Sequence, residues 1–324
     1  MDYMSILNFL YSQLFVTPQY PEQSCKGQVF IVTGANVGLG FEASRHLVRL
    51  GAEKVILACR NLEKGEAAVK DIEKSTKRIG VAEVWLLDLS SFESVEEFAK
   101  KVDTLPRIDA IVENAGINTK DFKLFEGNES TITVNVISTF LLALLVLPAL
   151  KRSSQKHNIQ PTLTIVASEV HHWTNLPERN KGDSIFDALA TPELSEMRER
   201  YEVSKLMDVF CTRALVEKTS PSYPVTINTM NPGFCYSELS REYNGFAFRL
   251  LYKLLARTTE VGSRTLVAAA LASHDTHGQY MSDCMVEEPA KFVRSDEGKR
   301  TQERVWAELS AKLEAIQPGI LKNI

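Results

Sequence analysis

The chain has 324 residues, of which 44% are hydrophobic and 24% are charged, enough to bury a large core within one domain. A net charge of −4 and a pI near 6.0 argue against nucleic acid as a partner, because its binding surface needs a basic patch that this sequence lacks. Five scattered cysteines without a CxxC pair favour a reducing compartment, so we expect a cytoplasmic protein.

Residues 1–24 are predicted to form an N-terminal extension, with an apolar helix at residues 4–16. This helix is interrupted by polar residues and is shorter than the roughly 20 residues that span a membrane. We expect it to pack on the domain or on a partner subunit of a homo-oligomer. A helix lying in a membrane interface is the alternative.

Strand and helix patterns alternate along the rest of the chain. The expected strands are residues 28–34, 54–60, 83–89, 109–116, 162–168 and 225–231, and the expected helices are residues 41–50, 62–77, 92–105, 131–150 and 201–218. The alternation predicts one doubly wound Rossmann-type α/β domain over residues 25–324, with a parallel sheet flanked by helices. The apolar run at residues 140–150 is too short to span a membrane and is predicted to be a buried helix.

Three glycines, Gly34, Gly38 and Gly40, lie where the first expected strand of the domain ends and its first helix begins. A helix N-terminus presents free N–H groups and a positive dipole end, which can bind a phosphate. Gly34 permits a tight turn, while Gly38 and Gly40 let a pyrophosphate and the neighbouring strand approach. The spacing G-x-x-x-G-x-G differs from the common dinucleotide fingerprint, so this turn alone leaves a purely structural role open.

Further motifs follow the glycine turn in a fixed order. They are Asp88-Leu89, Asn114-Ala115-Gly116, Asn135, Ser168, Tyr201-x-x-x-Lys205 and Pro232-Gly233. Over residues 27–285 the chain resembles the short-chain dehydrogenase/reductase family. The segments TGANVGLG, ILACRN and IVASEVHH are most similar to its retinol-dehydrogenase and WW-domain-oxidoreductase branch, and a fungal member is expected. Glu113 departs from the family, which commonly has a second Asn there; because this motif supports the sheet, we expect an effect on stability more than on chemistry.

The resemblance implies hydride transfer between a nicotinamide and a carbon that bears oxygen, which needs a proton donor or acceptor at that oxygen. Tyr201 is the candidate acid/base. Lys205, four residues further along the same helix face, is expected to favour its phenolate. By the resemblance, Lys205 also holds the nicotinamide ribose, Ser168 hydrogen-bonds the substrate oxygen, and Asn135 anchors a water that relays protons to Lys205.

The expected cofactor is NADP(H). An NAD enzyme of this fold usually has an Asp or Glu after the second strand, where this chain has Arg60. A guanidinium there can bind a 2′-phosphate, with Asn36 or Lys64 assisting. The predicted cofactor contacts are Gly34, Asn36, Gly38, Leu39, Gly40, Arg60, Asn61, Asp88, Leu89, Asn114, Ala115, Gly116, Tyr201, Lys205, Pro232, Gly233 and Ser237.

Substrate specificity is assigned to residues 170–200 and 234–260. The connection 173–200 carries five large apolar side chains, which are Trp173, Leu176, Ile185, Phe186 and Leu189. In a long loop between candidate catalytic residues, such side chains predict a substrate wall or lid, with surface packing or a subunit contact as the alternative. His171-His172 lacks a third ligand at a suitable spacing, so no metal site is expected.

These observations predict an NADP-dependent oxidoreductase (EC 1.1.1.-) that acts on a ketone, aldehyde or alcohol of a moderately large apolar molecule. A step in fungal secondary (polyketide) metabolism is the favoured context. The alternatives are a non-catalytic nucleotide-binding scaffold, and a dehydratase or isomerase that uses the same site without redox chemistry.

Overall fold

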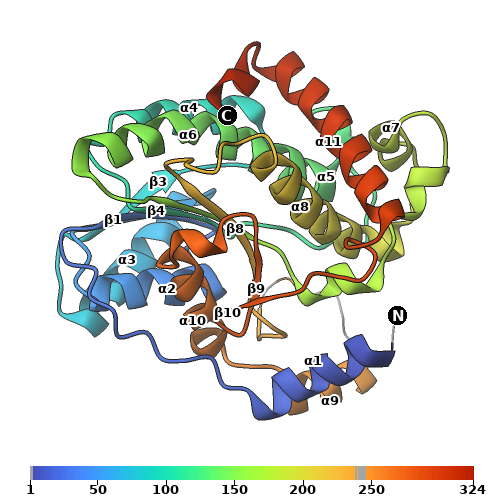
Figure 1. Cartoon of the computed structure of the whole chain (residues 1–324). Coiled ribbons are helices and arrows are strands. Elements are labelled where there is room, and N and C mark those ends of the chain that lie inside the picture. The colour runs from blue at the N-terminus through green and yellow to red at the C-terminus, as the bar shows by residue number, and fades with distance from the viewer. Residues whose placement is uncertain (1–2, 238, 240–245) are drawn as a thin grey trace.

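The computed structural model describes residues 3–237, 239 and 246–324, with an eight-stranded sheet at its centre (Figure 1). The strands are β1 (Val29–Thr33), β2 (Lys54–Cys59), β3 (Ala82–Leu86), β4 (Ala110–Glu113), β7 (Thr162–Val166), β8 (Thr226–Asn231), β9 (Tyr280–Ser282) and β10 (Met285–Glu287). Their order across the sheet is β10-β9-β8-β7-β4-β1-β2-β3. Neighbouring strands run parallel, as predicted, except at one edge of the sheet, where β9 and β10 are antiparallel.

Helices cover both faces of this sheet. One face carries α2 (Gly38–Arg49), α3 (Leu62–Thr76) and α10 (Thr259–Ala270), and the other carries α4 (Phe92–Asp103), α6 (Ser138–His157) and α8 (Arg200–Val216) (Figure 1). Outside these layers, α11 (Asp296–Ile316) packs on α8, while α1 (Tyr3–Phe15) and α9 (Phe246–Leu255) lie side by side at one end of the molecule. The predicted doubly wound Rossmann-type fold is confirmed.

The strands are buried on both faces because helices cover both sides of the sheet. In β1 all five side chains are buried. Alternate residues point to opposite faces, so Ile31 packs in the core layer under α4 and α6 while Phe30 and Val32 pack in the layer under α2 and α10. Because the strands run parallel, their carboxyl ends lie at one edge of the sheet. The predicted site residues lie at this edge.

The helix α6 supplies the centre of the larger core layer. Its run 140–150 is buried, as predicted, apart from two half-buried positions. The helical segment 130–157 is long and apolar enough to cross a membrane, but nearly all of its most apolar part is enclosed by the protein. It is therefore explained as a core helix.

Several elements differ from those expected. The helix predicted at residues 131–150 starts with a short turn of helix, α5 (Ser130–Ile132), and a π-helical turn, η1 (Thr133–Ile137). It continues to His157, where Asn158 takes a left-handed conformation (φ 51°) that ends it. The hairpin β5 (Leu124–Phe125) and β6 (Asn128–Glu129), and the strands β9 and β10, are two or three residues long, too short to show an alternating pattern.

The connection 173–200 is folded rather than open. It contains η3 (Pro177–Asn180), α7 (Ile185–Ala190) and η4 (Met197–Glu199), preceded by η2 (Glu169–Trp173). Four of its apolar side chains are at most 1% exposed and belong to the core: Leu176, Ile185, Phe186 and Leu189. This burial contradicts the expectation that these four side chains line a substrate wall. The reason is α11, whose Glu308 accepts a hydrogen bond from the N–H of Phe186 (3.0 Å) and holds α7 against the core.

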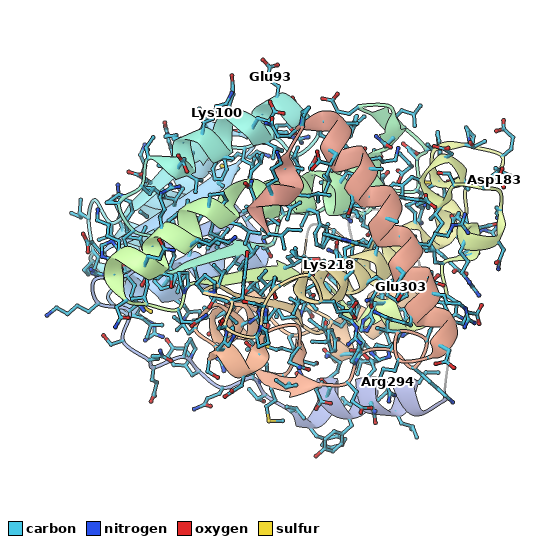
Figure 2. All side chains as sticks on the ribbon, turned by 45° about the horizontal axis from the view of Figure 1, so that its top comes forward. Glu93, Lys100, Asp183, Lys218, Arg294 and Glu303 are labelled. Carbon is cyan, nitrogen blue, oxygen red and sulfur yellow. The ribbon has the colours of Figure 1, made fainter. Side chains whose placement is uncertain are left out.

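The outer faces of the peripheral helices carry charges of both signs. Figure 2 shows Glu93 and Lys100 projecting from α4, and Glu303 from α11. The opposite face of α4 buries Val95 and Phe98 against the sheet. Each of these helices is thus amphipathic, which is what fixes its orientation on the sheet.

A buried ion-pair cluster fixes the start of α8. Arg200 is fully buried and lies 3.4 Å from a carboxylate oxygen of Glu129 and 3.2 Å from one of Glu178. It also donates to the Ser195 hydroxyl. Burial lowers the pKa of Arg200, and the two carboxylates oppose this shift. The cluster joins β6, η3 and α8 immediately before Tyr201.

Replacing Arg200 with Met should destabilise the protein by about 3–5 kcal/mol, because two buried carboxylates would lose their counter-charge. The measurement is the free energy of unfolding in urea. The matched control is Arg198→Met at an exposed position two residues earlier, which should leave stability almost unchanged. Equal stabilities of the two variants would contradict the structural role of Arg200.

Candidate functional site

The glycine turn after β1 is shaped by close packing at two of its three glycines. The N–H of Gly34 donates to the carbonyl of Ala58 (2.8 Å), and its φ is +64°. A Cβ on Gly34 would lie 2.9 Å from Ala115 Cα, and one on Gly40 would lie 2.6 Å from Asn114 Nδ2. These two glycines therefore let the turn pack against the segment that follows β4.

Gly38 has a different environment. Its φ is +66°, and a Cβ placed on it would meet nothing within 4 Å. The preceding Val37 is extended and provides no side-chain cap for α2. The N–H groups of the first turn of α2 are thus offered to the space beside Gly38, which fits the pyrophosphate of a dinucleotide cofactor.

The turn is held in place by β4. Thr33 Oγ1 accepts hydrogen bonds from the N–H groups of Asn114 (3.0 Å) and Ala115 (2.9 Å). The Asn114 side chain in turn donates to the carbonyl of Thr33 (2.9 Å). Asn114 and Ala115 therefore have a clear structural role, and with Gly116 they lie at the edge where the cofactor is predicted.

Residues after β2 and β3 reach the same edge. Arg60 is exposed at the end of β2, and Asn61 caps α3 by accepting the Lys64 N–H (2.9 Å). Asp88 accepts hydrogen bonds from the N–H (2.9 Å) and hydroxyl (2.7 Å) of Ser90, which makes it a turn residue.

The cap of α4 is Ser91, so an N-cap role for Asp88 is excluded. The neighbouring Leu89 is buried, and its carbonyl accepts the Ser138 hydroxyl (2.6 Å).

The three expected catalytic side chains come together at the ends of β7 and α8. Ser168 follows β7, and Tyr201 lies in the first turn of α8, where the Ser168 side chain acts to lower the pKa of the Tyr201 phenol against the effect of burial. Lys205 lies one turn further along α8, with its Nζ 5.8 Å from the centroid of the Tyr201 ring. The fold therefore brings the predicted hydroxyl, phenol and ammonium into one place.

The ammonium group of Lys205 is almost fully buried between sheet and helix. Its Nζ donates to the carbonyl of Val166 (2.8 Å) and to Asp208 Oδ2 (3.0 Å). Burial alone disfavours the charged form, but Asp208 and Tyr201 outweigh it and raise the pKa of Lys205. Lys205 is thus a fixed positive charge. Asp208 was not singled out in the sequence, although its position three residues after Lys205 places both on one helix face.

Lys205 lowers the pKa of Tyr201, as expected, but burial has the larger effect. Burial raises the pKa of Tyr201 above its ordinary value, and the opposing charge of Lys205 does not overcome this effect. Asp208 shares the charge of Lys205 and acts in the same direction as burial. Tyr201 therefore keeps its proton near neutral pH, and the isolated protein offers an acid here.

Asn135 lies in the π-helical turn η1, beside the end of β4. Its Oδ1 accepts the N–H of Ile117 (2.8 Å), and its Nδ2 donates to the Ile117 carbonyl (2.9 Å) and the Ser204 hydroxyl (3.0 Å). The side chain thus joins η1 to α8, one residue before Lys205. π-Helical turns occur frequently at functional sites.

Glu113 sits close to this centre. It is buried, and neither carboxylate oxygen has a partner in the part of the chain that the structure describes. Burial, and secondarily the charge of Asp208, raises its pKa well above the ordinary value, so Glu113 is a neutral acid. The same burial raises the pKa of Asp208 to about 6, although Lys205 opposes it. Glu113, where this chain departs from the family, therefore interacts electrostatically with Asp208, the partner of Lys205. The sequence alone suggests an effect on stability more than on chemistry.

Asn231, the last residue of β8, holds together the two segments that follow Ser168 and Pro232, and this role was not identified from the sequence. Its Oδ1 accepts the N–H groups of Glu169 (3.0 Å) and Gly233 (2.9 Å), and its Nδ2 donates to Glu169 Oε2 (3.0 Å). The Tyr280 hydroxyl also donates to Glu169 Oε2 (3.4 Å). Asn231 thus joins the segment after Ser168 to the Pro232-Gly233 segment; a polar residue ending a buried strand was the available signal.

The neighbouring His171 has a structural role. Its Nδ1 donates to the Ser168 carbonyl (2.7 Å) and its Nε2 accepts the N–H of Ala290 (3.0 Å), which defines a neutral ring. Burial lowers the pKa of His171 well below its ordinary value.

Ser237, predicted to contact the cofactor, follows Gly233 in the chain. Its N–H donates to the Tyr252 hydroxyl (2.7 Å), so Ser237 is held by α9.

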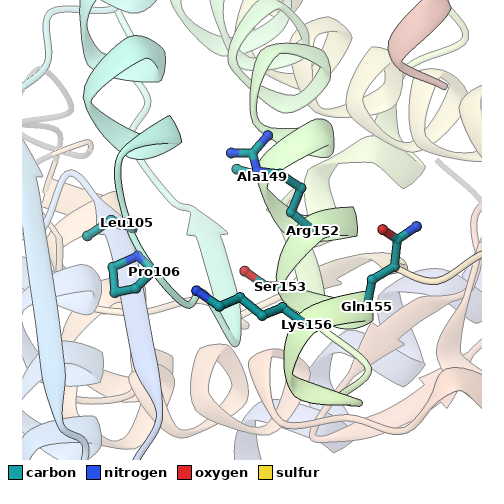
Figure 3. Close-up of a pocket in the computed structure, with 7 residues that line it drawn as sticks. All are labelled: Leu105, Pro106, Ala149, Arg152, Ser153, Gln155 and Lys156. Atoms are coloured by element: carbon teal, nitrogen blue, oxygen red, sulfur yellow. The ribbon is translucent and has the colours of Figure 1, made fainter.

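A separate hollow of about 460 Å³ lies between the C-terminal ends of α4 and α6 (Figure 3). It is lined by Leu105, Pro106, Ala149, Arg152, Ser153, Gln155 and Lys156. These residues precede β4 and β7 in the chain, so the hollow lies at the amino edge of the sheet. It is distinct from the site at the carboxyl edge.

Comparison with known proteins agrees with this geometry. The sequence pattern described as short chain dehydrogenase matches residues 28–160. The chain is 49% identical to the short chain dehydrogenase/reductase dmxR8 of Cryptosporiopsis sp., over 98% of this chain and 100% of that protein. The chain belongs to the short-chain dehydrogenase/reductase family.

One further relative and one solved structure are similar to this dehydrogenase in sequence and in fold. It is 46% identical to the short-chain dehydrogenase anuD of Penicillium roqueforti, over 98% of this chain and 85% of the relative. It has the same fold as a short chain dehydrogenase from Escherichia coli CFT073 solved in complex with NADPH, with a TM-score of 0.59 and 22% identity over 81% of this chain and 99% of the other. The fungal relatives agree with the expected fungal membership. Its placement in the retinol-dehydrogenase branch stays a prediction.

The side chain of Glu169, which accepts a hydrogen bond from Asn231, predicts a pH effect on the stability of this dehydrogenase. Burial raises the pKa of Glu169 to about 7, so the folded protein holds a proton that the unfolded chain has lost above about pH 4.5. This contribution is fully present at low pH and is lost as pH rises through about 7. Glu169→Gln should lack this loss, so the wild type should fall relative to the variant by up to about 3 kcal/mol between about pH 5 and pH 8.

Unfolding in urea at each pH measures this difference. Glu193→Gln, at an exposed position, is the control and should follow the wild type. A Glu169→Gln protein with the same pH dependence as the wild type would show that Glu169 is ionised throughout.

Proposed function

We propose that this dehydrogenase is an NADP(H)-dependent oxidoreductase that reduces a ketone or aldehyde group of a moderately large apolar molecule, or oxidises the corresponding alcohol. The observation that carries the proposal is the grouping of Ser168, Tyr201 and Lys205 at the same sheet edge as the uncapped N-terminus of α2. The likeness to fungal dehydrogenases along nearly the whole chain supports a step in fungal secondary metabolism, with a polyketide intermediate as the expected type of substrate.

The proposed chemistry assigns the proton to Tyr201. Its phenol donates to the substrate oxygen while the Ser168 hydroxyl holds that oxygen by a hydrogen bond. When bound at this edge, NADPH would supply the hydride that the carbonyl carbon accepts. Lys205 then stabilises the phenolate left on Tyr201, since its ammonium charge acts at short range in a buried site. Tyr201 is protonated near neutral pH, which is the form that carbonyl reduction requires.

Reprotonation of Tyr201 is proposed to pass through Lys205 and a water held near Asn135. The Nζ of Lys205 has three hydrogens, of which two go to Val166 and Asp208. Both side-chain N–H donors of Asn135 are engaged with Ile117 and Ser204, so the water would be held by the Asn135 main chain or by a lone pair of Oδ1.

The cofactor is proposed to lie along the carboxyl edge of the sheet. The N–H groups at the start of α2 and the open space beside Gly38 would take its pyrophosphate, and Asn114 to Gly116 would border the ribose and nicotinamide side. Arg60, with Asn36 or Lys64, would take a 2′-phosphate, since the residues directly after β2 are Arg60 and Asn61 rather than an Asp or Glu.

Two other functions would use the same residues. A scaffold would bind cofactor without turnover, and a dehydratase or isomerase would bind cofactor without consuming it. The presence of hydroxyl, phenol and ammonium in one place favours an enzyme. Following the absorbance of the reduced nicotinamide during turnover of a panel of carbonyl compounds separates the three.

Replacing Tyr201 with Phe should lower turnover by about 10²–10⁴-fold, the usual contribution of a general acid, while leaving the NADPH dissociation constant nearly unchanged. Steady-state kinetics and a fluorescence titration with NADPH measure the two quantities. Tyr11→Phe, on an exposed position of α1, is the matched control. Near-normal turnover in Tyr201→Phe would remove Tyr201 from the acid/base role.

Replacing Arg60 with Asp should weaken NADPH by about 10- to 100-fold and NADH far less, because the change removes a charge-assisted contact to the 2′-phosphate and adds a repelling charge. Dissociation constants of both cofactors test this for the wild type and the variant. Arg300→Asp, an exposed position on α11, makes the same charge change far from the site. Equal affinities of the wild type for NADPH and NADH, or equal loss of both in Arg60→Asp, would exclude the assignment.

A further inference from the structure

The N-terminal helix α1 is fastened to the domain by one buried arginine. Arg257 is 7% exposed, and its Nη2 donates to the carbonyls of Ser12 (2.8 Å) and Val16 (3.0 Å) at the end of α1. Its Nη1 donates to Asp283 Oδ1 (2.7 Å), and the Ser12 hydroxyl donates to Asp283 Oδ2 (2.6 Å). A guanidinium that satisfies the last carbonyls of a helix holds that end firmly. The position of α1 is therefore specified by side chains of the domain.

The fastened helix places an aromatic ring between the two segments that lead away from the candidate site. The ring of Phe9 makes edge contacts with Trp173 (centroids 6.0 Å apart, planes at 82°) and Phe234 (6.3 Å, 61°). Trp173 ends the turn that begins after Ser168, and Phe234 follows Gly233 directly. Phe9 thus lies where the segments after β7 and β8 meet.

The same helix lies directly on the Pro232-Gly233 segment. Gly233 has a φ of +80°, and a Cβ placed on it would lie 2.7 Å from Arg257 Nη1 and 2.9 Å from Gln13 Nε2. Two buried polar atoms nearby, Gln13 Oε1 and Trp173 Nε1, have no hydrogen-bond partner in the part of the chain that the structure describes. Buried polar atoms are normally paired, so a polar group of a ligand is a suitable partner for them.

The two faces of α1 differ in their surroundings. Phe9 and Gln13 are half-buried against the domain, whereas Tyr11 and Phe15 are 63% and 74% exposed. Phe9 and Gln13 are about one helical turn apart and therefore lie on the same face of α1, which is the face that reaches the site. This arrangement agrees with the expectation that the N-terminal helix packs on its own domain.

We propose that α1 completes the substrate pocket and that Phe9, with Trp173 and Phe234, selects substrates that carry an aromatic ring next to the reacting carbonyl. The inference rests on the proposed function. Phe9 meets the rings of Trp173 and Phe234 edge to face, and such rings offer further edge and face contacts to an aromatic substrate, which an aliphatic ring cannot make equally well. The N-terminal extension is thus a specificity element, in addition to residues 170–200 and 234–260.

The test compares Phe9→Ala with Phe15→Ala, the same change on the exposed face of the same helix. The probes are tetralone, a bicyclic aromatic ketone whose carbonyl adjoins the aromatic ring, and cyclohexanone, which lacks that ring. Phe9→Ala should raise the Michaelis constant for tetralone about tenfold and that for cyclohexanone less than about threefold, with kcat and the NADPH dissociation constant little changed. Phe15→Ala should match the wild type in all four quantities, and Phe9→Leu should fall between the two.

A binding measurement keeps this test separate from the proposed chemistry. In the Tyr201→Phe background, binding of tetralone to the NADPH complex is followed by cofactor fluorescence, with and without Phe9→Ala. A tetralone complex that is tenfold weaker only with Phe9→Ala supports the role of Phe9 in the substrate pocket, whether or not Tyr201 is the acid. A wild type that binds the two ketones equally, or a Phe9→Ala protein that loses both ketones and NADPH alike, overturns it; retained turnover in Tyr201→Phe instead overturns the acid/base assignment.

Discussion

The buried ammonium of Lys205 is the contact through which sheet, helix and site are connected. A cation in this position is costly unless it is paired and hydrogen-bonded. The Val166 carbonyl of β7 and the Asp208 carboxylate of α8 meet this requirement, and in doing so they fix the distance between strand and helix. Tyr201 and Ser168 are brought to the same place because Tyr201 lies in α8 and Ser168 follows β7 by two residues. Stability and the arrangement of the reacting groups therefore depend on the same contact.

The electrostatic state of the centre follows from burial more than from the charges within it. Desolvation raises the pKa of Tyr201, Asp208 and Glu113 alike, and Lys205 opposes it in part at Tyr201 and Asp208. Three groups that can hold a proton thus surround one fixed cation. A cofactor whose ribose and nicotinamide enclose this space would alter the desolvation further, so the protonation of Tyr201 and the occupancy of the site are coupled.

The fold and the candidate site differ in how far the sequence predicts them. The doubly wound sheet could be predicted because its strands are buried runs that alternate with amphipathic helices, and the Tyr201-Lys205 pair because it has a fixed spacing on one helix. Asn231 and Glu169 could not, since they are 62 positions apart and meet only through the pairing of β7 with β8. The apolar residues around Phe186 were assigned to the substrate because hydropathy reports burial without saying against what; the partner is α11.

The hydrogen bonds that Arg257 makes to the end of α1 and to Asp283 also show which residues belong to the folded unit. The family pattern starts at residue 28, and a domain cut there would look complete by its motifs. Such a chain would keep the guanidinium and Asp283 but lose the carbonyls of Ser12 and Val16, and it would uncover Gly233 and Phe234. The folded unit therefore extends upstream of the conventional domain boundary and includes α1.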